Sequence, residues 1–378
     1  MRLPIFKLEE YLSEREFNCE IMFSGSDMET YQMQELLNLA SPQTKQLWDS
    51  LNLSYTHPKG HPILLEEINK RYQLPSSFEN ICTFNGAEEA IYVALTNILN
   101  KDDHAIVFSP CYQSLKDLPK HLCEVSELPM EFSNGMCSFN LDILPTLIKK
   151  NTKIIIINFP HNPTGHILSN AELNFLVDIA RKHNLYIFSD EVYRGLEITK
   201  SAQLPPLASK YEKGISLGVL SKSYGLPGLR IGWLASQDNA LMTKVSQFKH
   251  YLTICNGAPS EILAIIALQN ETTIYNRNQK IIEKNLNLLR NFFLNRNEIF
   301  EWFEPKGGCI AYPKLKLNTS AYDFCEQFSQ KQKVQLLPGD VFDHYENHFR
   351  VGFGRVNMPE ALKRFDIFLN NCNFQRKI

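Results

Sequence analysis

The sequence predicts an α/β fold, with a large domain built on a mostly parallel sheet between helices and a smaller α+β domain. Three observations predict it. Between about residues 80 and 236, short apolar runs alternate with helical patterns, which is typical of a parallel sheet covered on both faces. One run, 153–159, is almost purely β-branched and apolar, as expected for a strand buried on both faces. A chain of 378 residues, at roughly 150 residues per domain, suggests two domains.

Short apolar runs predict the strands of the large sheet. In chain order they are 81–85, 105–108, 153–159, 185–188, 215–220 and 229–235. A pattern with one apolar face follows the first of them and predicts a helix over 87–99. Ser169 and Glu172 form a capping box, which predicts a helix from 170 to about 183. Further helices are expected, among shorter strands, over 260–298 (one or two helices), 321–331 and 359–370.

The change from alternating strands and helices to a mainly helical pattern sets the expected domain boundary near residue 270. We expect a large domain at 46–270, and a small domain formed by 1–45 and 271–378 together. No Gly/Ser-rich or Pro-rich linker separates independent domains.

Composition excludes several classes of protein. The chain has 39 basic and 41 acidic residues, so it is neither a globally basic nucleic-acid binder nor an acidic tail protein. Its nine cysteines are scattered, with no C-x-x-C pair and no Cys/His cluster of zinc-ligand spacing, which predicts reduced thiols and no metal site. No apolar run is long enough for a signal peptide or a membrane span. We therefore expect a soluble cytoplasmic protein.

Four predicted strands are each followed by a polar or glycine-containing loop. The loops are 86–88, 160–165, 189–193 and 221–230. In open α/β sheets, ligands bind beyond the carboxyl ends of the strands. We therefore expect the four loops to meet at one rim and to form one site.

The residue types in these loops suggest chemistry, although each also has an ordinary structural interpretation. A lone lysine is usually a solvated surface residue, but a desolvated lysine near a cation such as Arg230 has a depressed pKa and can form a Schiff base, which points to Lys222. Asp190 is either a helix N-cap or a functional carboxylate, and no clear helix begins there. Asn162 alone would be a turn residue. Gly86 opens a helix whose N-terminus could hold a phosphate.

Taken together, three motifs resemble those of the class I/II aminotransferases of the aspartate aminotransferase superfamily, which are fold-type I enzymes that use pyridoxal 5′-phosphate (PLP). The motifs are Asn158-x-Pro160-x-Asn162-Pro163-Thr164-Gly165, Asp190-Glu191-Val192-Tyr193 and Ser221-Lys222-Ser223-Tyr224-Gly225-Leu226-x-Gly228-x-Arg230-x-Gly232-Trp233. The resemblance extends from about residue 55 to 355. It implies a seven-stranded-type sheet and a small domain built from both termini.

The resemblance implies catalytic roles for residues of the last two motifs. Lys222 would bind the cofactor as an aldimine and then move a proton between the substrate Cα and the cofactor. Asp190 would keep the pyridine nitrogen protonated, so that the ring acts as an electron sink. Tyr193 and Asn162 would hydrogen-bond the 3′ oxygen of the cofactor.

The remaining cofactor contacts are also implied by the resemblance. Arg230 would pair with the phosphate, and Ala87 and Glu88 would offer backbone N–H groups to it. Tyr112 matches the aromatic residue that stacks on the cofactor ring. Tyr55 matches a tyrosine that reaches the phosphate of the neighbouring subunit, which implies a homodimer.

On the substrate side, Arg350 matches the arginine that clamps the α-carboxylate of the amino acid, with Arg355 as an alternative. Asn162 and Gly25 would lie near the same carboxylate. Two departures stand out: Val219 replaces a usual hydroxyl donor to the phosphate, with Ser221 as a candidate substitute, and the N-terminal stretch 21–40 lacks the common family pattern.

These residues predict PLP-dependent transfer of an amino group between an L-amino acid and a 2-oxo acid. The alternative is β-elimination, C–S lysis, replacement or cyclisation of an amino acid on the same scaffold, because the motifs do not specify the substrate pocket. A DNA-binding regulator that carries this fold is disfavoured, because no basic module precedes the match. His161 beside the Asn162 turn is a further candidate for substrate contact.

Overall fold

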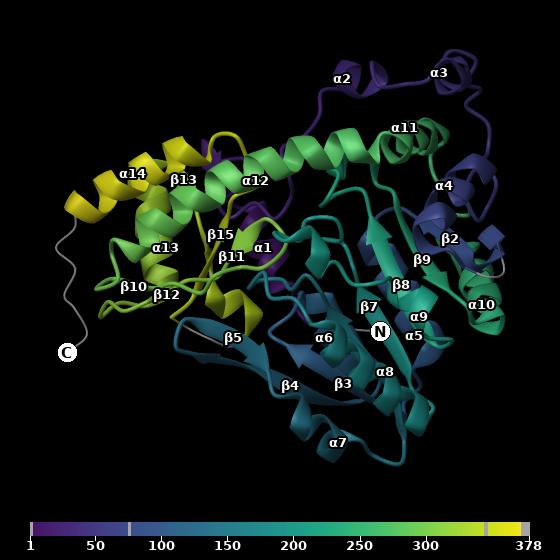
Figure 1. Ribbon diagram of the computed structural model, residues 1–378, viewed down its shortest axis with the longest axis horizontal. Helices are drawn as coiled ribbons and strands as arrows, with labels where there is room; N and C mark the ends of the chain where they lie inside the picture. The colour runs from purple at the N-terminus through teal and green to yellow at the C-terminus, as the bar shows by residue number, and fades with distance from the viewer. Residues whose placement is uncertain (1–2, 75–76, 344–346, 372–378) are drawn as a thin grey trace.

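The computed structural model describes residues 3–74, 77–343 and 347–371, and its centre is one large sheet (Figure 1). The strand order is β2-β9-β8-β7-β6-β3-β4-β5. Strands β3, β4, β6, β7 and β8 run parallel to one another, whereas β9 is antiparallel to both β2 and β8. The strands are β2 (Ile81–Phe84), β3 (His104–Ser109), β4 (Glu124–Ser133), β5 (Met136–Phe139), β6 (Thr152–Asn158), β7 (Tyr186–Asp190), β8 (Gly214–Val219) and β9 (Gly232–Ser236).

All six strands predicted for this sheet are present, and the sheet has one hairpin more than predicted. Strands β4 and β5 pair antiparallel and add an eighth strand at the edge, so the seven-stranded type is extended by one. Asn134 and Gly135 connect them with φ values of 51° and 71°, which fits the tight two-residue hairpin turn that Asn-Gly favours. The expected run 229–235 begins as a strand only at Gly232, because a short 3₁₀ turn, Pro227–Leu229, precedes it.

Helices cover both faces of the sheet, as the continuous apolar strands predict. Ile154 and Ile156 of β6 belong to the apolar cluster that includes α5, α6 and α10. Ile155 and Ile157 point to the other face and pack with Leu176 and the rest of α8. The helices are α1 (Lys7–Ser13), α2 (Met33–Leu37), α3 (Pro42–Asp49), α4 (Pro62–Tyr72), α5 (Ala87–Ile98), α6 (Gln113–Leu122), α7 (Leu144–Leu147), α8 (Asn170–His183), α9 (Leu207–Lys210), α10 (Asn239–Lys249), α11 (Ala258–Gln269), α12 (Glu271–Leu294), α13 (Ala321–Gln332) and α14 (Met358–Asn371).

Local signals account for the helix ends. The capping box is confirmed at α8: the Ser169 hydroxyl accepts from the Glu172 N–H, and the Glu172 carboxylate accepts from the Ser169 N–H. The helical stretch expected over 260–298 is two helices, α11 and α12, which separate at Asn270. Among the described residues, no helix is both long and apolar enough to cross a membrane.

The two ends of the chain build a second layer beside the sheet. Strand β1 (Ile21–Met22) pairs parallel with β13 (Val334–Gln335), and β15 (Phe349–Gly352) lies between β11 (Ile310–Ala311) and β14 (Leu337–Pro338). A short ladder, β10 (Phe300–Glu301) with β12 (Lys314–Leu315), completes the strands. The long helix α12 runs from the large sheet to this layer (Figure 1). This arrangement places residues from both termini at the carboxyl ends of the sheet strands.

Candidate active site

A cavity of about 630 Å³ lies between the carboxyl ends of the strands and the terminal layer. The loops after β2, β6, β7 and β8 all contribute to its wall, as the sequence predicts. The predicted site residues that line it are Gly25, Ala87, Glu88, Tyr112, Asn162, Asp190, Tyr193, Lys222, Arg230 and Arg350. Tyr55 is 84% exposed and does not line the cavity of its own chain.

Lys222 follows β8, and its ammonium group donates to the Ser26 hydroxyl over 2.8 Å. Burial lowers the pKa of Lys222, and the Arg350 guanidinium lowers it further, although Asp27 acts in the opposite direction. A lysine amine with a lowered pKa is available as a nucleophile and as a base. Ser26 was not predicted as its partner, because the two residues are distant in sequence. They are brought together by contacts that no local pattern reveals, such as the bond from the Met28 N–H to the Lys222 carbonyl at 3.3 Å.

Asp190 ends β7 and is almost fully buried. Its Oδ1 accepts from the Val192 N–H at 3.2 Å, and the Asn158 amide donates to the Asp190 carbonyl at 3.0 Å. Burial raises the pKa of Asp190 to about 7, which the Val192 N–H and Lys222 partly oppose. A buried carboxylate of this kind is well suited to hold a cationic ligand group.

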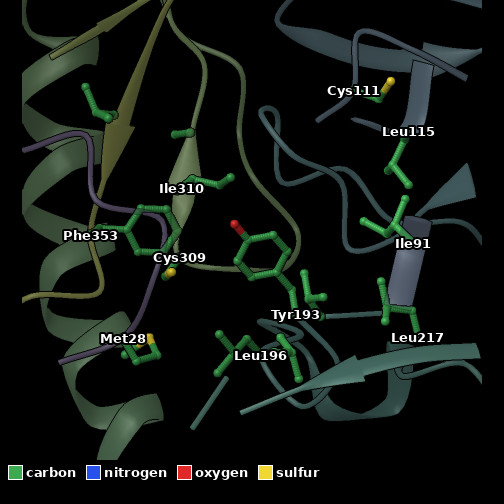
Figure 2. Close-up of a cluster of buried hydrophobic side chains, with 14 of the residues drawn as sticks. Met28, Ile91, Cys111, Leu115, Tyr193, Leu196, Leu217, Cys309, Ile310 and Phe353 are labelled. Carbon is green, nitrogen blue, oxygen red and sulfur yellow. The ribbon is translucent and has the colours of Figure 1, made fainter. Parts of the chain in front are cut away.

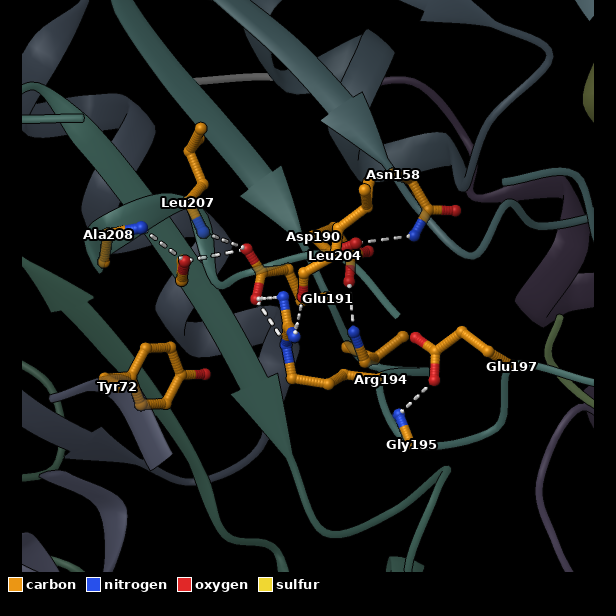
Figure 3. Close-up of polar contacts among 12 residues, drawn as sticks. Tyr72, Asn158, Asp190, Glu191, Arg194, Gly195, Glu197, Leu204, Leu207 and Ala208 are labelled. Atoms are coloured by element: carbon orange, nitrogen blue, oxygen red, sulfur yellow. Dashed lines mark hydrogen bonds and ion pairs between the residues drawn. The ribbon is translucent and has the colours of Figure 1, made fainter. Parts of the chain in front are cut away.

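Glu191, the next residue, does not line the cavity. Its carboxylate accepts from the Leu207 N–H at 2.9 Å and the Ser216 hydroxyl at 2.8 Å, and it pairs with Arg194 at 2.8 Å (Figure 3). The side chain therefore anchors the segment after β7. This anchor holds Asp190 on the cavity side of the sheet.

Tyr193 is 1% exposed, and its ring packs among apolar side chains that include Leu196 and Ile310 (Figure 2). The hydroxyl points toward the C-terminal strands and makes no hydrogen bond of ordinary geometry among the described residues. Burial raises the pKa of Tyr193, so the phenol stays protonated. An unpaired buried hydroxyl that lines a cavity indicates that a ligand atom completes its hydrogen bonding.

Arg350, on β15, is 2% exposed and reaches across from the terminal layer to the sheet. It donates to the Asn162 side-chain oxygen over 3.1 Å and to the Ser24 carbonyl over 3.2 Å. Burial lowers its pKa. A buried cation with no carboxylate partner attracts an anionic ligand group. Arg355, the alternative, also lines the cavity but is paired with Asp27 at 2.7 Å.

One end of the cavity is built to hold an anion. Gly86, at φ 94°, is the N-cap of α5, so the first backbone N–H groups of that helix face the cavity wall at Ala87. Arg230 lies against Gly86 so closely that any Cβ there would collide with its guanidinium. Among the described residues, the Arg230 guanidinium makes only long bonds to backbone carbonyls, 3.3 Å to Pro227 and 3.4 Å to Asn85. The positive φ of residue 86 favours glycine, and a Cβ there would displace the Arg230 guanidinium.

Val219 stands where the family pattern has a hydroxyl donor to the phosphate, and Ser221 is the candidate to replace that donor. Val219 lines the cavity and contributes no hydrogen-bonding side chain. Ser221 lines it as well, so the hydroxyl of this loop that reaches the cavity comes from the residue next to Lys222. This arrangement supports Ser221 as the substitute donor.

Tyr112 begins α6, and its ring packs on Phe6 with the centroids 5.3 Å apart. Its hydroxyl donates to Glu9 Oε1 at 2.9 Å. Neither Phe6 nor Glu9 was predicted, because α1 is a short N-terminal helix that no family motif marks. The position of α1 depends on contacts with the C-terminal layer, which local sequence patterns do not reveal.

His161 is buried but does not line the cavity, so the prediction that it contacts substrate is wrong. Its Nε2 lies 2.7 Å from the Pro110 carbonyl, which only accepts, so Nδ1 accepts from Thr164, 2.8 Å away. Burial lowers the pKa of His161 to about 3. The ring is a neutral spacer that fixes the turn at Asn162.

These groups fit PLP. The unpaired Tyr193 hydroxyl and Asn162 suit a phenolic oxygen, the buried Asp190 carboxylate suits a protonated ring nitrogen, and Lys222 suits an aldehyde. The α5 N-terminus and Arg230 suit a phosphate.

Comparisons with known proteins agree with this geometry. Residues 29–365 match the family described as aminotransferase class I and II. A solved PLP-dependent aminotransferase from Streptococcus suis 89-1591 superposes with a TM-score of 0.92 and 31% identity, and all of both chains is covered. Capreomycidine synthase of Streptomyces vinaceus is 28% identical over 93% of this chain and 90% of its own. Aspartate aminotransferase of Thermotoga maritima is 29% identical over 84% of each chain.

Proposed function

Because the chain belongs to the aminotransferase class I and II family, we propose how its own residues perform the reaction of that family. The protein is a PLP-dependent aminotransferase of fold type I, which transfers an amino group between an amino acid and a 2-oxo acid. The observation that supports the residue roles is the convergence of Lys222, Asp190 and Arg350 on one cavity.

The first proposed role is proton transfer by Lys222. When bound, PLP supplies an electron-withdrawing ring that stabilises negative charge on the substrate Cα. The Lys222 amine, with its lowered pKa, accepts the Cα proton and later returns it. The buried Asp190 carboxylate holds the protonated ring nitrogen, and Tyr193 with Asn162 holds the phenolic oxygen.

The second proposed role is orientation of the substrate by Arg350. Its guanidinium is already fixed by Asn162 and by the Ser24 carbonyl, so it presents a preorganised fork to the α-carboxylate. Gly25 lies in the same wall and leaves room beside it. This clamp would fix the orientation of the bound amino acid.

The third proposed role is retention of the phosphate. Arg230, the backbone N–H groups of Ala87 and Glu88, and the Ser221 hydroxyl surround one end of the cavity. Tyr112 covers the ring from the side of α6. Together these residues would hold the phosphate end of the cofactor in place through the reaction.

We further propose a homodimer in which Tyr55 completes the phosphate site of the partner. The support is a group of large exposed apolar side chains in two segments of the chain: Leu53, Tyr55, Tyr251, Leu252 and Ile254. The Thr56 hydroxyl donates to the Asn256 carbonyl at 3.2 Å and so joins the two segments. Two other predictions also remain proposals: the domain division at 46–270 against 1–45 plus 271–378, and a cytoplasmic location. The pairing of β1 with β13 supports the first, and the free thiol state of every described cysteine supports the second.

The proposed function is tested by mixing purified holoenzyme with pooled L-amino acids, without any 2-oxo acid. We expect the visible absorption of the bound cofactor to bleach and 2-oxo acids to appear by mass spectrometry. The Lys222→Ala variant should lack the absorption band of the lysine-bound cofactor and all turnover, whereas Lys182→Ala, at an exposed lysine on α8, should behave as wild type. Turnover by Lys222→Ala would contradict the assignment.

A second candidate function is replacement or cyclisation on an amino-acid side chain. The similarity to capreomycidine synthase over 93% of this chain favours it. The same experiment separates the two functions by product: a non-oxo product that accumulates while the absorption band persists or returns would identify a lyase or cyclase.

A further inference from the structure

We propose that the amino donor is an α-amino acid with an aliphatic side chain that ends in a cationic nitrogen, and that Glu9 of α1 binds that nitrogen. This inference rests on the proposed function, because it names the substrate class of the same cavity. It is argued from the charged and apolar side chains of the cavity that have no proposed role in binding the cofactor or the α-carboxylate.

Every cationic group that lines the cavity among the described residues has another partner or role. Lys222 bonds to Ser26 and binds the cofactor, and Arg230 lies at the phosphate end. Arg350 serves the α-carboxylate. Arg355 pairs with Asp27 through Nη2 at 2.7 Å, and its buried Nε makes no hydrogen bond among the described residues. The described lining therefore holds no cation that lacks both a carboxylate partner and a proposed role, which disfavours a dicarboxylic amino acid.

The carboxylates show the opposite pattern. Glu9 and Glu16, from α1 and the turn after it, both line the cavity and form no ion pair among the described residues. Glu9 is held in place by the Tyr112 hydroxyl, 2.9 Å away, so one carboxylate oxygen is fixed beside the aromatic ring that covers the cofactor. The negative charge of Glu9 raises the pKa of both Lys222 and Arg350 and so opposes the effect of their burial. The charge of Glu9 therefore influences the groups at the centre of the site.

Apolar side chains line the cavity together with these carboxylates. Phe6, Leu12 and Met22 line the same cavity as Glu9. A methylene chain fits against such a wall, while the charged end reaches the carboxylate at the rim. A fully apolar substrate would leave Glu9 without a cation, and a short polar one would not reach it.

Helix α1 is anchored firmly enough to act as a specificity element. Leu8 and Tyr11 are buried against the terminal layer. The Asp343 carboxylate forms ion pairs with two lysines, Lys7 of α1 and Lys116 of α6, the latter at 2.8 Å. The helix is thereby tied both to the terminal layer and to the helix that carries Tyr112.

The test compares substrates and variants in the holoenzyme. Values of kcat/KM are measured for L-ornithine, L-lysine and L-arginine against L-norleucine and L-glutamate, in wild type, Glu9→Gln and the control Glu10→Gln. Glu10 lies on the same helix but does not line the cavity. Titration calorimetry with 2-methylornithine and 2-methylnorleucine, which lack the Cα proton, measures binding without turnover.

We expect wild type to prefer at least one cationic substrate over norleucine by about tenfold or more, as a charge-assisted bond to a carboxylate gives. Glu9→Gln should lose most of that preference in both kcat/KM and calorimetric affinity, with norleucine unchanged and Glu10→Gln like wild type. Preference for glutamate or norleucine, or an unchanged ratio in Glu9→Gln, would overturn the inference. If no amino acid is converted, the proposed function fails, and the calorimetric ratio alone decides the role of Glu9.

Discussion

At the scale of single residues, Arg350 shows how a binding group is prepared before the substrate arrives. Its side chain is buried, and two hydrogen bonds fix its orientation. Arg350→Ala should raise KM for amino acids by about 10- to 100-fold, because a charge-assisted bond contributes about 1.5–3 kcal/mol. Arg350→Lys should raise KM less, since lysine keeps the positive charge but lacks the planar guanidinium that binds a carboxylate with two hydrogen bonds.

Steady-state kinetics with the preferred amino acid, and cofactor affinity by fluorescence, check this prediction. Cofactor affinity should stay near wild type in both variants. An unchanged KM in Arg350→Ala, together with a raised KM in Arg355→Ala, would transfer the role of carboxylate clamp to Arg355.

Asp190 gives a prediction about stability and pH. Burial raises its pKa in the folded apoenzyme from 3.8 to about 7. A group whose pKa is raised on folding stabilises the protein at low pH, and this contribution is lost as the pH rises through the folded pKa. The melting temperature of the apoenzyme should therefore fall as the pH rises from about 4 to about 7. The Asp190→Asn variant should lack the part of this fall that Asp190 causes.

Differential scanning calorimetry of apo wild type and apo Asp190→Asn across this range measures the difference. Glu88 and Glu261 also have pKa values that burial raises, so they contribute to the pH dependence of both proteins. Only the difference in melting temperature between wild type and Asp190→Asn reports on Asp190. Parallel curves for the two proteins would show that Asp190 does not titrate there.

The meeting of the motif residues at one cavity could be predicted, because their positions at strand ends follow from local pattern. Asp190 and Lys222 come directly after apolar runs, and parallel strands bring such ends to one edge. Ser26 and Glu9 could not be found in this way. Their places depend on pairing between the two ends of the chain, which leaves no local signature in the sequence.

At the scale of elements, the connection between α10 and α11 joins two parts of the site. Asn256 Oδ1 accepts from Lys249 at 2.8 Å and from the Thr83 hydroxyl at 2.9 Å, and its amide donates to Asn85 Oδ1 at 2.9 Å. Lys249 also donates to the Pro58 carbonyl at 2.7 Å. The loop that carries Tyr55 is thus fixed to the residue that precedes Gly86.

Asn256→Ala should therefore affect both stability and cofactor binding. It leaves the buried Lys249 and Asn85 short of partners, which costs about 1–3 kcal/mol of unfolding free energy. It should also weaken cofactor affinity through the phosphate end. Urea unfolding and cofactor titration measure the two effects, with Gln247→Ala on the exposed side of α10 as the control. Lost stability with unchanged cofactor affinity would show that the network has no influence on the phosphate end.

Strongly patterned elements were predicted and weakly patterned ones were not. The strand β6, with its run of four isoleucines, and the capped helix α8 lie within a residue or two of their predicted bounds. The β4–β5 hairpin and helices α1 to α4 were missed. Their burial is partial or one-sided, so packing against distant segments, more than local pattern, determines them.

At the scale of the whole molecule, the proposed dimer makes a separate prediction. Tyr55→Phe should leave the dimer intact and weaken cofactor binding, because only the hydroxyl that reaches the partner's phosphate is lost. Tyr251→Asp, at a side chain 89% exposed, should shift the protein toward monomers.

Sedimentation velocity and cofactor titration check both variants, and Tyr322→Phe, at an exposed tyrosine on α13, is the control. A wild-type monomer at micromolar concentration would remove the basis for the role of Tyr55.

The strand order has a consequence for how the enzyme is made. Strand β9 lies between β2 and β8, and β1 can pair only after β13, which lies far along the chain from it, has been synthesised. At about 5–20 residues per second, the ribosome needs on the order of tens of seconds to reach β13. Until then, Lys222 and the N-terminal half of the chain lack the completed cavity wall that Arg350 and α1 form together. Cofactor loading is therefore a late event of biosynthesis, and a chain released early from translation has no pocket to load.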